Sequence, residues 1–294
     1  MSEPLVSVAI VTYNHELFIE DTVRSVITQD YSNIEIIIGD DASTDSSPEK
    51  LERLKIAYPQ IKLILGNENK GITENFNRVL SACSGKYVAW MGGDDLMLPT
   101  KLRKQVKFME SHDECNICFH NLEVFESENG RILYIFNDEN HPKDGEIDIL
   151  IKYGTFNGAC SNLTRRSSHP PYGFDVRIPV ASDWLFWIEC LSKGGRICYI
   201  DEVLGRYRKH SKSVTNPNSA GYFQAKLDHL NTCNILLFKF PKYTSQICYR
   251  LSRIYRNLAI LYKEHERGFL LMSLKTRFNI KVLVRFLLTF FNRN

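Results

Sequence analysis

The sequence lacks the two glycine-rich loops that most often bind nucleotide phosphates. No Gly-x-Gly-x-x-Gly follows the first apolar run at residues 6–11, and no Gly-x-x-x-x-Gly-Lys-Ser/Thr occurs in the 294 residues. The first motif lets the backbone approach a dinucleotide, and the second surrounds the phosphates of a nucleoside triphosphate. Their absence argues against nicotinamide-dependent enzymes and P-loop nucleotidases.

A complete zinc motif and a secretory leader are also missing. Cys115 and Cys118 form one Cys-x-x-Cys, but no second pair accompanies them among the eight cysteines, so no structural zinc site is predicted. The first apolar run has no basic flank and leads directly into a strand pattern, unlike a signal peptide. We therefore expect free buried thiols and a cytoplasmic location.

The formal net charge is only +3, yet it is distributed unevenly. Residues 219–294 contain 13 Lys and Arg against 3 Asp and Glu, whereas residues 1–218 contain 24 against 31. An acidic body can attract a metal ion, and a basic C-terminal part suits an anionic surface. We expect no nucleic-acid partner.

Strand-like and helical patterns alternate through the first hundred residues. Strands are expected at residues 6–11, 34–38, 61–65 and 87–91, and helices at residues 16–28, 48–58 and 72–83. This alternation predicts an α/β fold with a mostly parallel sheet flanked by helices, whose ligand lies at the carboxyl ends of the strands. A Ser-, Asn-, Pro- and Gly-rich stretch at residues 213–221 then separates a first domain, residues 1–215, from a helical C-terminal appendage, residues 216–294.

Acidic side chains follow two of the expected strands. Asp40 and Asp41 are adjacent directly after the second strand, with Ser43 and Asp45 close behind. Helix capping explains one or two of these residues. Two adjacent carboxylates repel each other unless a ligand or cation relieves the repulsion, so we interpret this cluster as a binding site.

The second acidic cluster is Gly92-Gly93-Asp94-Asp95, at the end of the fourth strand. Two glycines allow the backbone to approach a ligand, and paired carboxylates suit Mg²⁺ or Mn²⁺ bridging a diphosphate. The alternative is an ordinary turn that leads into the next helix. Because both acidic clusters fall at the ligand edge of one sheet, the binding interpretation is favoured.

Five segments in order resemble the inverting glycosyltransferases of family 2, in the bacterial polysaccharide type. They are residues 6–14, 25–31, 35–45, 69–77 and 85–95, and the resemblance extends over roughly residues 5–210. It implies a GT-A fold with a donor half at about residues 1–115 and an acceptor half at about residues 116–215. Family members often have a further Asp where Gly92 stands, so the metal site would depend on Asp94 and Asp95.

The resemblance also implies roles for individual residues. Asp41 would hold the base of the nucleotide, Asp94 would lie near the ribose, and Asp95 would be the direct metal ligand. The other residues expected to contact the nucleotide sugar are Thr12, Tyr13 and Asn14 in the base pocket and Asn69, Gly71 and Asn75 in the loop and helix that close over it.

An inverting transfer needs one general base, and Asp183 is the candidate. It precedes an aromatic-rich helix start, where an Asp can also be a simple cap. Family members carry their base aspartate at this position, often as Glu-Asp, and here Ser182 replaces the Glu. Trp184 and Trp187 are interpreted as core residues. Asp175 is the second candidate for the base.

The segment Gly205-Arg206-Tyr207-Arg208-Lys209-His210 resembles the family's Tyr-Arg-x-His sequence. His210 is therefore predicted to complete the metal site. Arg206 or Arg208 is predicted to neutralise the diphosphate. The alternative is a basic run on a solvated face.

The apolar C-terminal stretch at residues 269–291 is interrupted by four basic residues. Residues 277, 281 and 285 are spaced four apart and would line one helical face. Such a helix is too charged to cross a bilayer, but it suits lying on one. A helix packed on the catalytic domain with its basic side in water is the alternative.

The sequence thus predicts a metal-dependent enzyme, with Mn²⁺ or Mg²⁺, that transfers a hexose from a nucleoside diphosphate sugar. A UDP-sugar is the favoured donor, and the acceptor is a hydroxyl of a growing, lipid-linked bacterial surface glycan. The product would be β-linked, and the protein would be peripheral at the inner membrane. The alternatives are a catalytically degenerate nucleotide-sugar-binding protein and a sugar-1-phosphate nucleotidyltransferase.

Overall fold

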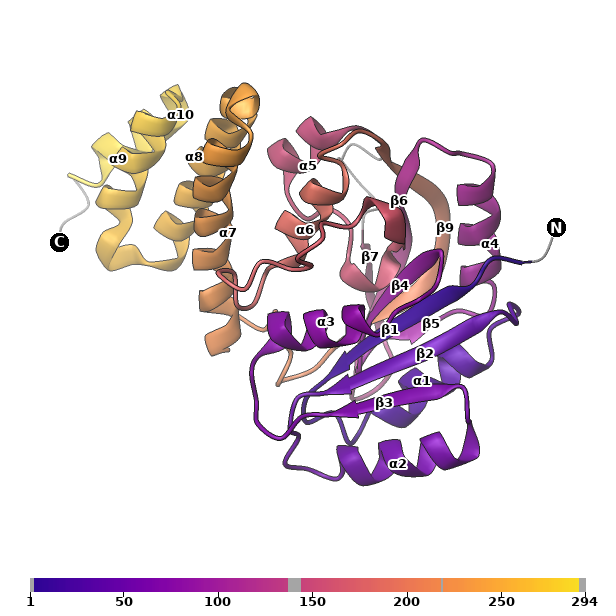
Figure 1. Cartoon of the computed structure of the whole chain (residues 1–294). Coiled ribbons are helices and arrows are strands. Elements are labelled where there is room, and N and C mark those ends of the chain that lie inside the picture. Colours follow the sequence, from indigo (N-terminus) through magenta and orange to yellow (C-terminus); the bar gives the residue numbers. More distant parts are fainter. Residues whose placement is uncertain (1–2, 137–143, 218, 291–294) are drawn as a thin grey trace.

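The computed structural model describes residues 3–136, 144–217 and 219–290. Within these residues one curved sheet of nine strands carries helices on both faces, and a group of helices lies to one side of it (Figure 1). The strands follow the order β3-β2-β1-β4-β8-β6-β9-β5, with β7 paired to β6. The α/β class and the helical C-terminal part are as predicted.

The N-terminal half of the sheet is parallel. Every residue of β1 is buried, as expected for a parallel strand covered on both faces. Its strands are β1 (Val6–Thr12), β2 (Ile34–Asp40), β3 (Ile61–Leu65) and β4 (Tyr87–Gly92), and its helices are α1 (Ile19–Ile27), α2 (Ser47–Ala57) and α3 (Ile72–Ser81). These bounds lie within three residues of the predicted ones.

The second half of the sheet is mixed, and its pairing positions the site. Strand β8 runs antiparallel between β4 and β6, while β9 lies parallel to β6 and antiparallel to β5. The pairing of β5 with β9 brings the end of β9 to the turn that follows β4. The elements are β5 (Leu96–Met97), α4 (Lys101–Glu110), β6 (Cys115–Glu126), β7 (Ile132–Phe136), α5 (Ile147–Tyr153), β8 (Leu163–Arg165), α6 (Asp183–Cys190) and β9 (Arg196–Lys209).

The C-terminal helices are α7 (Ala220–Lys239), α8 (Thr244–Leu261), α9 (Glu266–Thr276) and α10 (Ile280–Leu288). Helices α7 and α8 belong to the same hydrophobic core as α5 and α6, because Leu236 and Leu251 are buried in one cluster with Trp184 and Trp187. The two tryptophans are therefore core residues, as predicted. Among the described helices, none is long and apolar enough to cross a membrane.

Helices α9 and α10 are attached differently. A small separate cluster of Ala259, Leu270 and Val282 holds them to α8. Arg277 has extended backbone and ends α9, so α9 and α10 are two helices. The prediction that residues 277, 281 and 285 line one helical face was therefore wrong.

Candidate functional site

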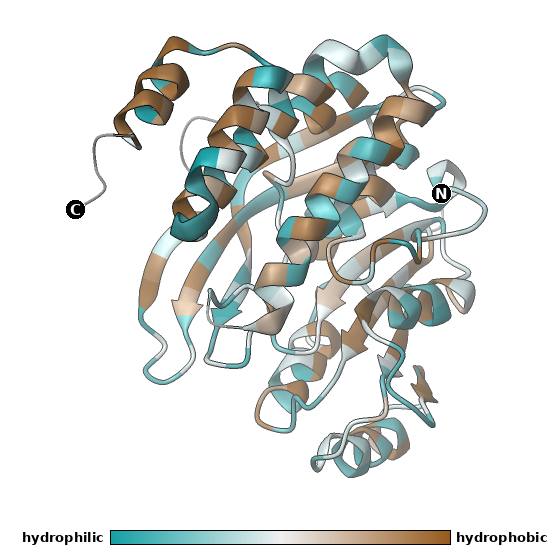
Figure 2. Cartoon of the chain, turned by 90° about the vertical axis from the view of Figure 1, so that its left-hand side faces the viewer, coloured by the Kyte–Doolittle hydropathy of each residue, from teal (hydrophilic) through white to brown (hydrophobic). Residues whose placement is uncertain are grey.

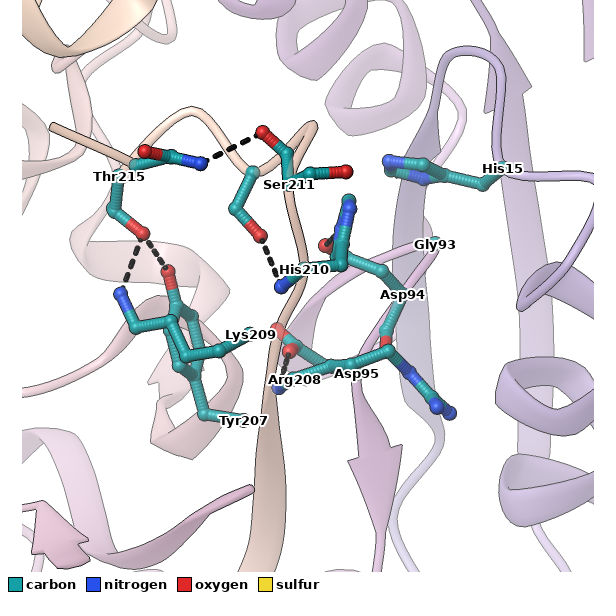
Figure 3. A network of polar contacts seen from close by, with 12 residues as sticks. His15, Gly93, Asp94, Asp95, Tyr207, Arg208, Lys209, His210, Ser211 and Thr215 are labelled. Carbon is teal, nitrogen blue, oxygen red and sulfur yellow. Dashed lines mark hydrogen bonds and ion pairs between the residues drawn. The ribbon is translucent and has the colours of Figure 1, made fainter. Parts of the chain in front are cut away.

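Three potential metal ligands converge where β1, β4 and β9 end. His15 follows β1, Asp94 follows β4 and His210 follows β9, and their ligand atoms all lie within 4.8 Å of one another (Figure 3). His210 Nε2 lies 3.0 Å from Asp94 Oδ2. Side chains from three segments far apart in the sequence thus meet at the predicted edge of the sheet.

The turn after β1 is shaped by side chains from the turn after β2. Asn14 has a positive φ of 55°, and its backbone N–H donates to Ser43 Oγ over 2.8 Å. The Asn14 side-chain oxygen accepts the N–H of Thr44, also at 2.8 Å. Asn14 is therefore occupied in shaping the loop that carries His15.

Gly93 is required by close packing. A Cβ at this position would lie 2.5 Å from Thr12 Oγ1, closer than atoms can approach. Thr12 Oγ1 also lies 3.2 Å from His15 Nδ1, so Thr12 orients the imidazole. The absence of a side chain at residue 93 lets the turn after β4 come against the end of β1.

Arg208 joins β9 to the turn that carries the acids. Its backbone N–H donates to Asp95 Oδ1 over 3.0 Å, and its Nε donates to the Asp94 carbonyl over 2.7 Å. The guanidinium lies 4.8 Å from the ring centre of Phe18 and 4.7 Å from that of Phe125. Arg208 is 7% exposed, and these contacts fix the turn that carries the two acids against the end of β9.

Arg206 also has a partner within the chain. It lies 3.1 Å from the Glu123 carboxylate and 4.2 Å from the ring centre of Phe125. Neither predicted arginine converges with the three ligands, because alternate residues of β9 face Glu123 and Phe125 on neighbouring β6. The predicted contact of either arginine with the diphosphate stays a prediction.

The two adjacent acids, Asp94 and Asp95, have different surroundings in the structure. The sequence assigned Asp95 to the metal and Asp94 to the ribose, but it is Asp94 that joins His15 and His210. Asp95 is buried, and its carboxylate is turned toward the backbone of Arg208. Asp94 is therefore the acid of the three-residue cluster, and the predicted metal contact of Asp95 stays a prediction.

The ionisation of the cluster suits metal binding. Burial lowers the pKa of His15, which favours the neutral imidazole that a metal requires. Burial opposes ionisation of Asp94, but the hydrogen bond to His210 and the nearby imidazoles outweigh it and lower the pKa of Asp94. Burial and the charge of Asp94 raise the pKa of Asp95 well above its usual value. Asp94 is thus the carboxylate that is ready to act as a ligand.

Asp41 organises the loop between β3 and α3. Its carboxylate accepts the N–H of Gly71 over 2.7 Å and that of Lys70 over 3.1 Å, and it pairs with Arg78 at 2.8 Å. Asn69 accepts the same Gly71 N–H over 3.1 Å. The structure therefore brings Asp41, Asn69 and Gly71 together, with the Asp41 carboxylate holding the loop, and their contacts with the nucleotide stay predictions.

Two of the predicted nucleotide contacts lie in different surroundings. Asn75 is buried and donates to the Gly39 carbonyl over 2.8 Å, so its amide supports the end of β2. Tyr13 is 42% exposed, which leaves its ring free to stack on a base. Their predicted contacts with the nucleotide stay predictions.

Asp183 lies at the first residue of α6 and is half-buried. Burial raises its pKa to about 6, although the Trp184 N–H donates to it over 2.8 Å. The preceding Ser182 accepts a hydrogen bond from Thr73 over 2.8 Å, which ties the start of α6 to the start of α3. Asp183 therefore stands next to the helix that begins at the Asp41-bound loop.

Asp175, the second candidate for the base, is paired. Arg177 contacts both of its carboxylate oxygens, and these hydrogen bonds lower the pKa of Asp175. A carboxylate held ionised by a cation is a weaker proton acceptor than one whose pKa is raised. The structure favours Asp183 over Asp175.

A cavity of about 770 Å³ adjoins the cluster. The cavity is lined by Asn14, Asp45 and His210, by residues of the β6–β7 hairpin, and by the loop after β9. This volume lies in the range of pockets that bind drug-sized ligands. The basic side chains among its lining residues are Lys209 and Lys212.

Sequence reasoning missed His15, Lys209 and Lys212. His15 directly follows the Thr12-Tyr13-Asn14 segment, and an imidazole one residue beyond a strand-end motif was the available signal. The two lysines had no comparable signal, because the path of the chain at the end of β9 determines which side chains line the cavity.

The sequence model of glycosyl transferase family 2 matches residues 7–169, which is more than half of the chain. The chain belongs to this family. The match begins at β1 and includes His15 and Asp94, whereas His210 lies beyond it.

Curated relatives agree with this assignment. The chain is 32% identical over 211 residues to an uncharacterized protein of Mycobacterium tuberculosis, covering 71% of this chain and 60% of that protein. It is 31% identical to an uncharacterized glycosyltransferase of Haemophilus influenzae, covering 72% of this chain and 68% of that protein. It is 30% identical to a Bacillus subtilis protein named as the teichuronic acid biosynthesis glycosyltransferase TuaG, covering 73% and 82%. The chain thus spans less than two thirds of the mycobacterial relative.

Solved structures show the same fold. The crystal structure of S. aureus TarS 1-349 has a TM-score of 0.68 at 17% identity, covering 92% of this chain and 80% of the 1-349 chain. Its complex with UDP-GlcNAc has a TM-score of 0.59 at 17% identity, with coverages of 94% and 88%. The mannosyltransferase PcManGT from Pyrobaculum calidifontis, in complex with GDP-Man and Mn²⁺, has a TM-score of 0.58 at 16% identity. The match covers 98% of this chain and 88% of that chain. The fold is therefore the GT-A fold.

Proposed function

We propose that the protein is a metal-dependent glycosyltransferase that moves a hexose from a nucleoside diphosphate sugar, a UDP-sugar, to a hydroxyl of a growing glycan. The observation that carries this proposal is the convergence of His15, Asp94 and His210 beside a cavity of about 770 Å³ at the carboxyl edge of a GT-A sheet. Family membership, and the nucleotide sugars named in the TarS and PcManGT complexes, support it.

Two imidazoles and one carboxylate fit a divalent cation with mixed nitrogen and oxygen ligands. Mg²⁺ prefers oxygen ligands alone, so this donor set favours Mn²⁺. A bound cation would stabilise the negative charge that develops on the departing nucleoside diphosphate. Within the chain, Thr12 orients His15, and Arg208 keeps the Asp94 turn against β9.

Asp183 is proposed as the general base that takes the proton from the acceptor hydroxyl. Its pKa of about 6 leaves it ionised at neutral pH yet basic enough to accept a proton. One base and a direct attack by the acceptor invert the anomeric centre, so an α-linked donor would give a β-linked product. The hydrogen bond from Thr73 to Ser182 holds this base near the loop that Asp41 organises.

The acceptor is proposed to be a lipid-linked bacterial surface glycan, assembled at the cytoplasmic face of the inner membrane by a peripheral enzyme. The name of the Bacillus subtilis relative, teichuronic acid biosynthesis glycosyltransferase, supports an extracellular polysaccharide as the product class. The basic C-terminal region supports the membrane contact.

The test is donor turnover. The purified chain is incubated with Mn²⁺ and, in parallel, UDP-GlcNAc, UDP-glucose and GDP-mannose, and release of the nucleoside diphosphate is measured with and without chelator. We expect release from a UDP-sugar, its loss with chelator and its recovery with Mn²⁺. Full activity in excess chelator would contradict the metal site. Tight donor binding without turnover, even when acceptor extracts are added, would favour the catalytically degenerate alternative. Release of pyrophosphate from UTP would favour the nucleotidyltransferase.

A further inference from the structure

Helix α10 turns its apolar side to solvent. Its residues 280, 284, 287 and 288 follow the i, i+4, i+7, i+8 spacing of one helical face, which in a globular protein normally packs on the core. Here Val282 is the buried residue of the helix. The exposed fractions on the apolar face are 61% for Ile280, 50% for Val284, 49% for Leu287 and 51% for Leu288. Figure 2 shows the hydrophobic colour over much of this last helix.

The apolar surface continues beyond α10. Phe278, just before the helix, is 69% exposed, and Phe290, just after it, is 55% exposed. On α9, Leu271 and Met272 are 40% and 45% exposed. We call these residues, with the four on α10, the α9–α10 apolar face. Many exposed apolar side chains on neighbouring helices mark a site of contact with a partner or a membrane.

Basic side chains accompany this face. Lys281 on α10 and Lys275 on α9 are exposed, and neither forms an ion pair with a described acid. The other two basic residues of the stretch are occupied, because Arg285 pairs with Glu266 at 2.5 Å and Arg277 lies over the ring of Tyr249. The face therefore combines apolar insertion residues with two free ammonium groups.

The charge of the whole region identifies the occupant. Residues 219–294 contain 13 Lys and Arg against 3 Asp and Glu. A second copy of the chain would bring two such basic regions together, which repel each other. A bilayer with anionic headgroups attracts the same charges and also accepts apolar side chains. Because none of the described helices can cross a membrane, the contact would be peripheral.

We propose that the α9–α10 apolar face binds an anionic lipid bilayer. Helix α10 lies in the plane of the interface, with Ile280, Val284 and Leu287 among the acyl chains and with the two lysines among the headgroups. In Figure 1 the carboxyl ends of β1–β3 point toward the side on which α7–α10 lie. Docking by α10 would thus bring the substrate edge to the membrane side, a consequence that rests on the proposed function, whereas lipid binding itself does not.

Cosedimentation with vesicles tests this proposal. The full chain is mixed with vesicles of phosphatidylethanolamine and phosphatidylglycerol and, separately, of phosphatidylcholine alone. We expect binding to the anionic vesicles and about tenfold or greater weakening by the double variant Val284→Glu with Leu287→Glu, which places charge in the apolar layer. Lys281→Gln should weaken binding about fivefold, the usual effect of removing one basic residue near an anionic surface.

Ile56→Glu on α2 is the matched control. Ile56 is 81% exposed and lies outside the apolar face, so the same substitution should leave vesicle binding unchanged. Since all the substituted side chains are exposed, circular dichroism and melting curves should match the parent chain. Equal vesicle binding by the Val284→Glu, Leu287→Glu chain and the parent would overturn the proposal.

Self-association is the competing outcome. Three results together would favour self-association: the parent chain forms a dimer in analytical ultracentrifugation, the double variant does not, and the parent does not bind vesicles. In that case the face is an interface between copies, and the proposal fails. No sugar nucleotide enters these measurements. Failure of lipid binding would therefore remove the proposed membrane contact but leave the donor-release test untouched, and failure of donor release would leave lipid binding standing.

Discussion

Two regions of the molecule reverse the usual placement of side chains, in opposite senses. At the carboxyl edge of the sheet, polar groups such as Asp41 and Asp95 are buried, and each is held by backbone N–H groups. On α10, apolar side chains face solvent. Folding alone favours neither arrangement, so both regions are built for contact with something outside the chain. The first suits a polar, charged ligand, and the second suits an apolar surface.

The packing of the C-terminal helices sharpens this contrast. Helices α7 and α8 contribute Leu236 and Leu258 to the core that lies behind the sheet. The division at residues 215 and 216 is therefore not a division of the core. The difference begins at α9, where Leu270 and Val282 belong to a small cluster of their own. Val282 is the buried residue of α10, so most of that helix is available for docking.

The largest effect is expected at the catalytic edge. Asp183→Asn keeps the size of the side chain but removes the base, so turnover should fall by about 10² to 10⁴ while donor affinity barely changes. In the parent enzyme the rate should decline as pH falls through about 6, because protonated Asp183 cannot accept a proton. Measurements are kcat against pH and donor binding by calorimetry. The matched variant Asp175→Asn should keep near-normal turnover, and the reverse ranking would make Asp175 the base.

The second test compares the two cores through matched leucines that are both fully buried. Leu236→Ala leaves a cavity in the main core and should cost about 2–5 kcal/mol of global unfolding free energy. Leu270→Ala should leave the main unfolding transition nearly unchanged, because α9 and α10 can open locally. Denaturant melts report the first effect, and limited proteolysis of the C-terminal helices reports the second. Equal loss of global stability in both variants would mean that α9 and α10 belong to one cooperative unit with the sheet.

The third test separates the adjacent acids. Asp94→Asn removes the carboxylate of the cluster and should weaken Mn²⁺-dependent UDP binding about 100-fold, whereas Asp95→Asn should weaken it about tenfold or less. Asparagine at residue 95 can still accept the Arg208 N–H, so the turn should persist. Calorimetry with UDP, with and without Mn²⁺, measures both. A larger effect at Asp95 would restore the ligand assignment made from the sequence.

The smallest effect concerns the stability of the base site. The folded-state pKa of Asp183, about 6, lies above the usual aspartate value of 3.8. The folded protein therefore binds this proton more tightly than the unfolded chain, and the stabilisation is present below pH 4 and lost as pH rises through 6. Above pH 6, Asp183→Asn should be more stable than the parent by about 1–2 kcal/mol, since partial hydration reduces the full effect. Urea melts at pH 5 and pH 7.5 measure the difference, which should shrink at the lower pH.

Much of the fold was predictable because local pattern and tertiary packing agree in the first hundred residues. Runs such as Ile36-Ile37-Ile38 are buried on both faces, and a continuous apolar run is what such a strand needs. The mixed half of the sheet was harder to predict from the sequence. The partners of β9 are β6 and β5, which lie far from it in sequence, and no local signal specifies that pairing.

By itself the sequence determined the α/β class, the family and the edge of the sheet where the acids gather, because strand periodicity and strand-end motifs are local properties. It also determined that the C-terminal region is basic. Only the tertiary structure decided that Asp94 and not Asp95 meets His210, that His15 joins them, and that Arg208 supports the turn from behind. The direction of a side chain depends on the backbone geometry of its turn and on the strand brought beside it. The same holds for α10, whose apolar stripe was visible in the sequence, while its exposure to solvent followed from the way Val282 docks on α8 and α9.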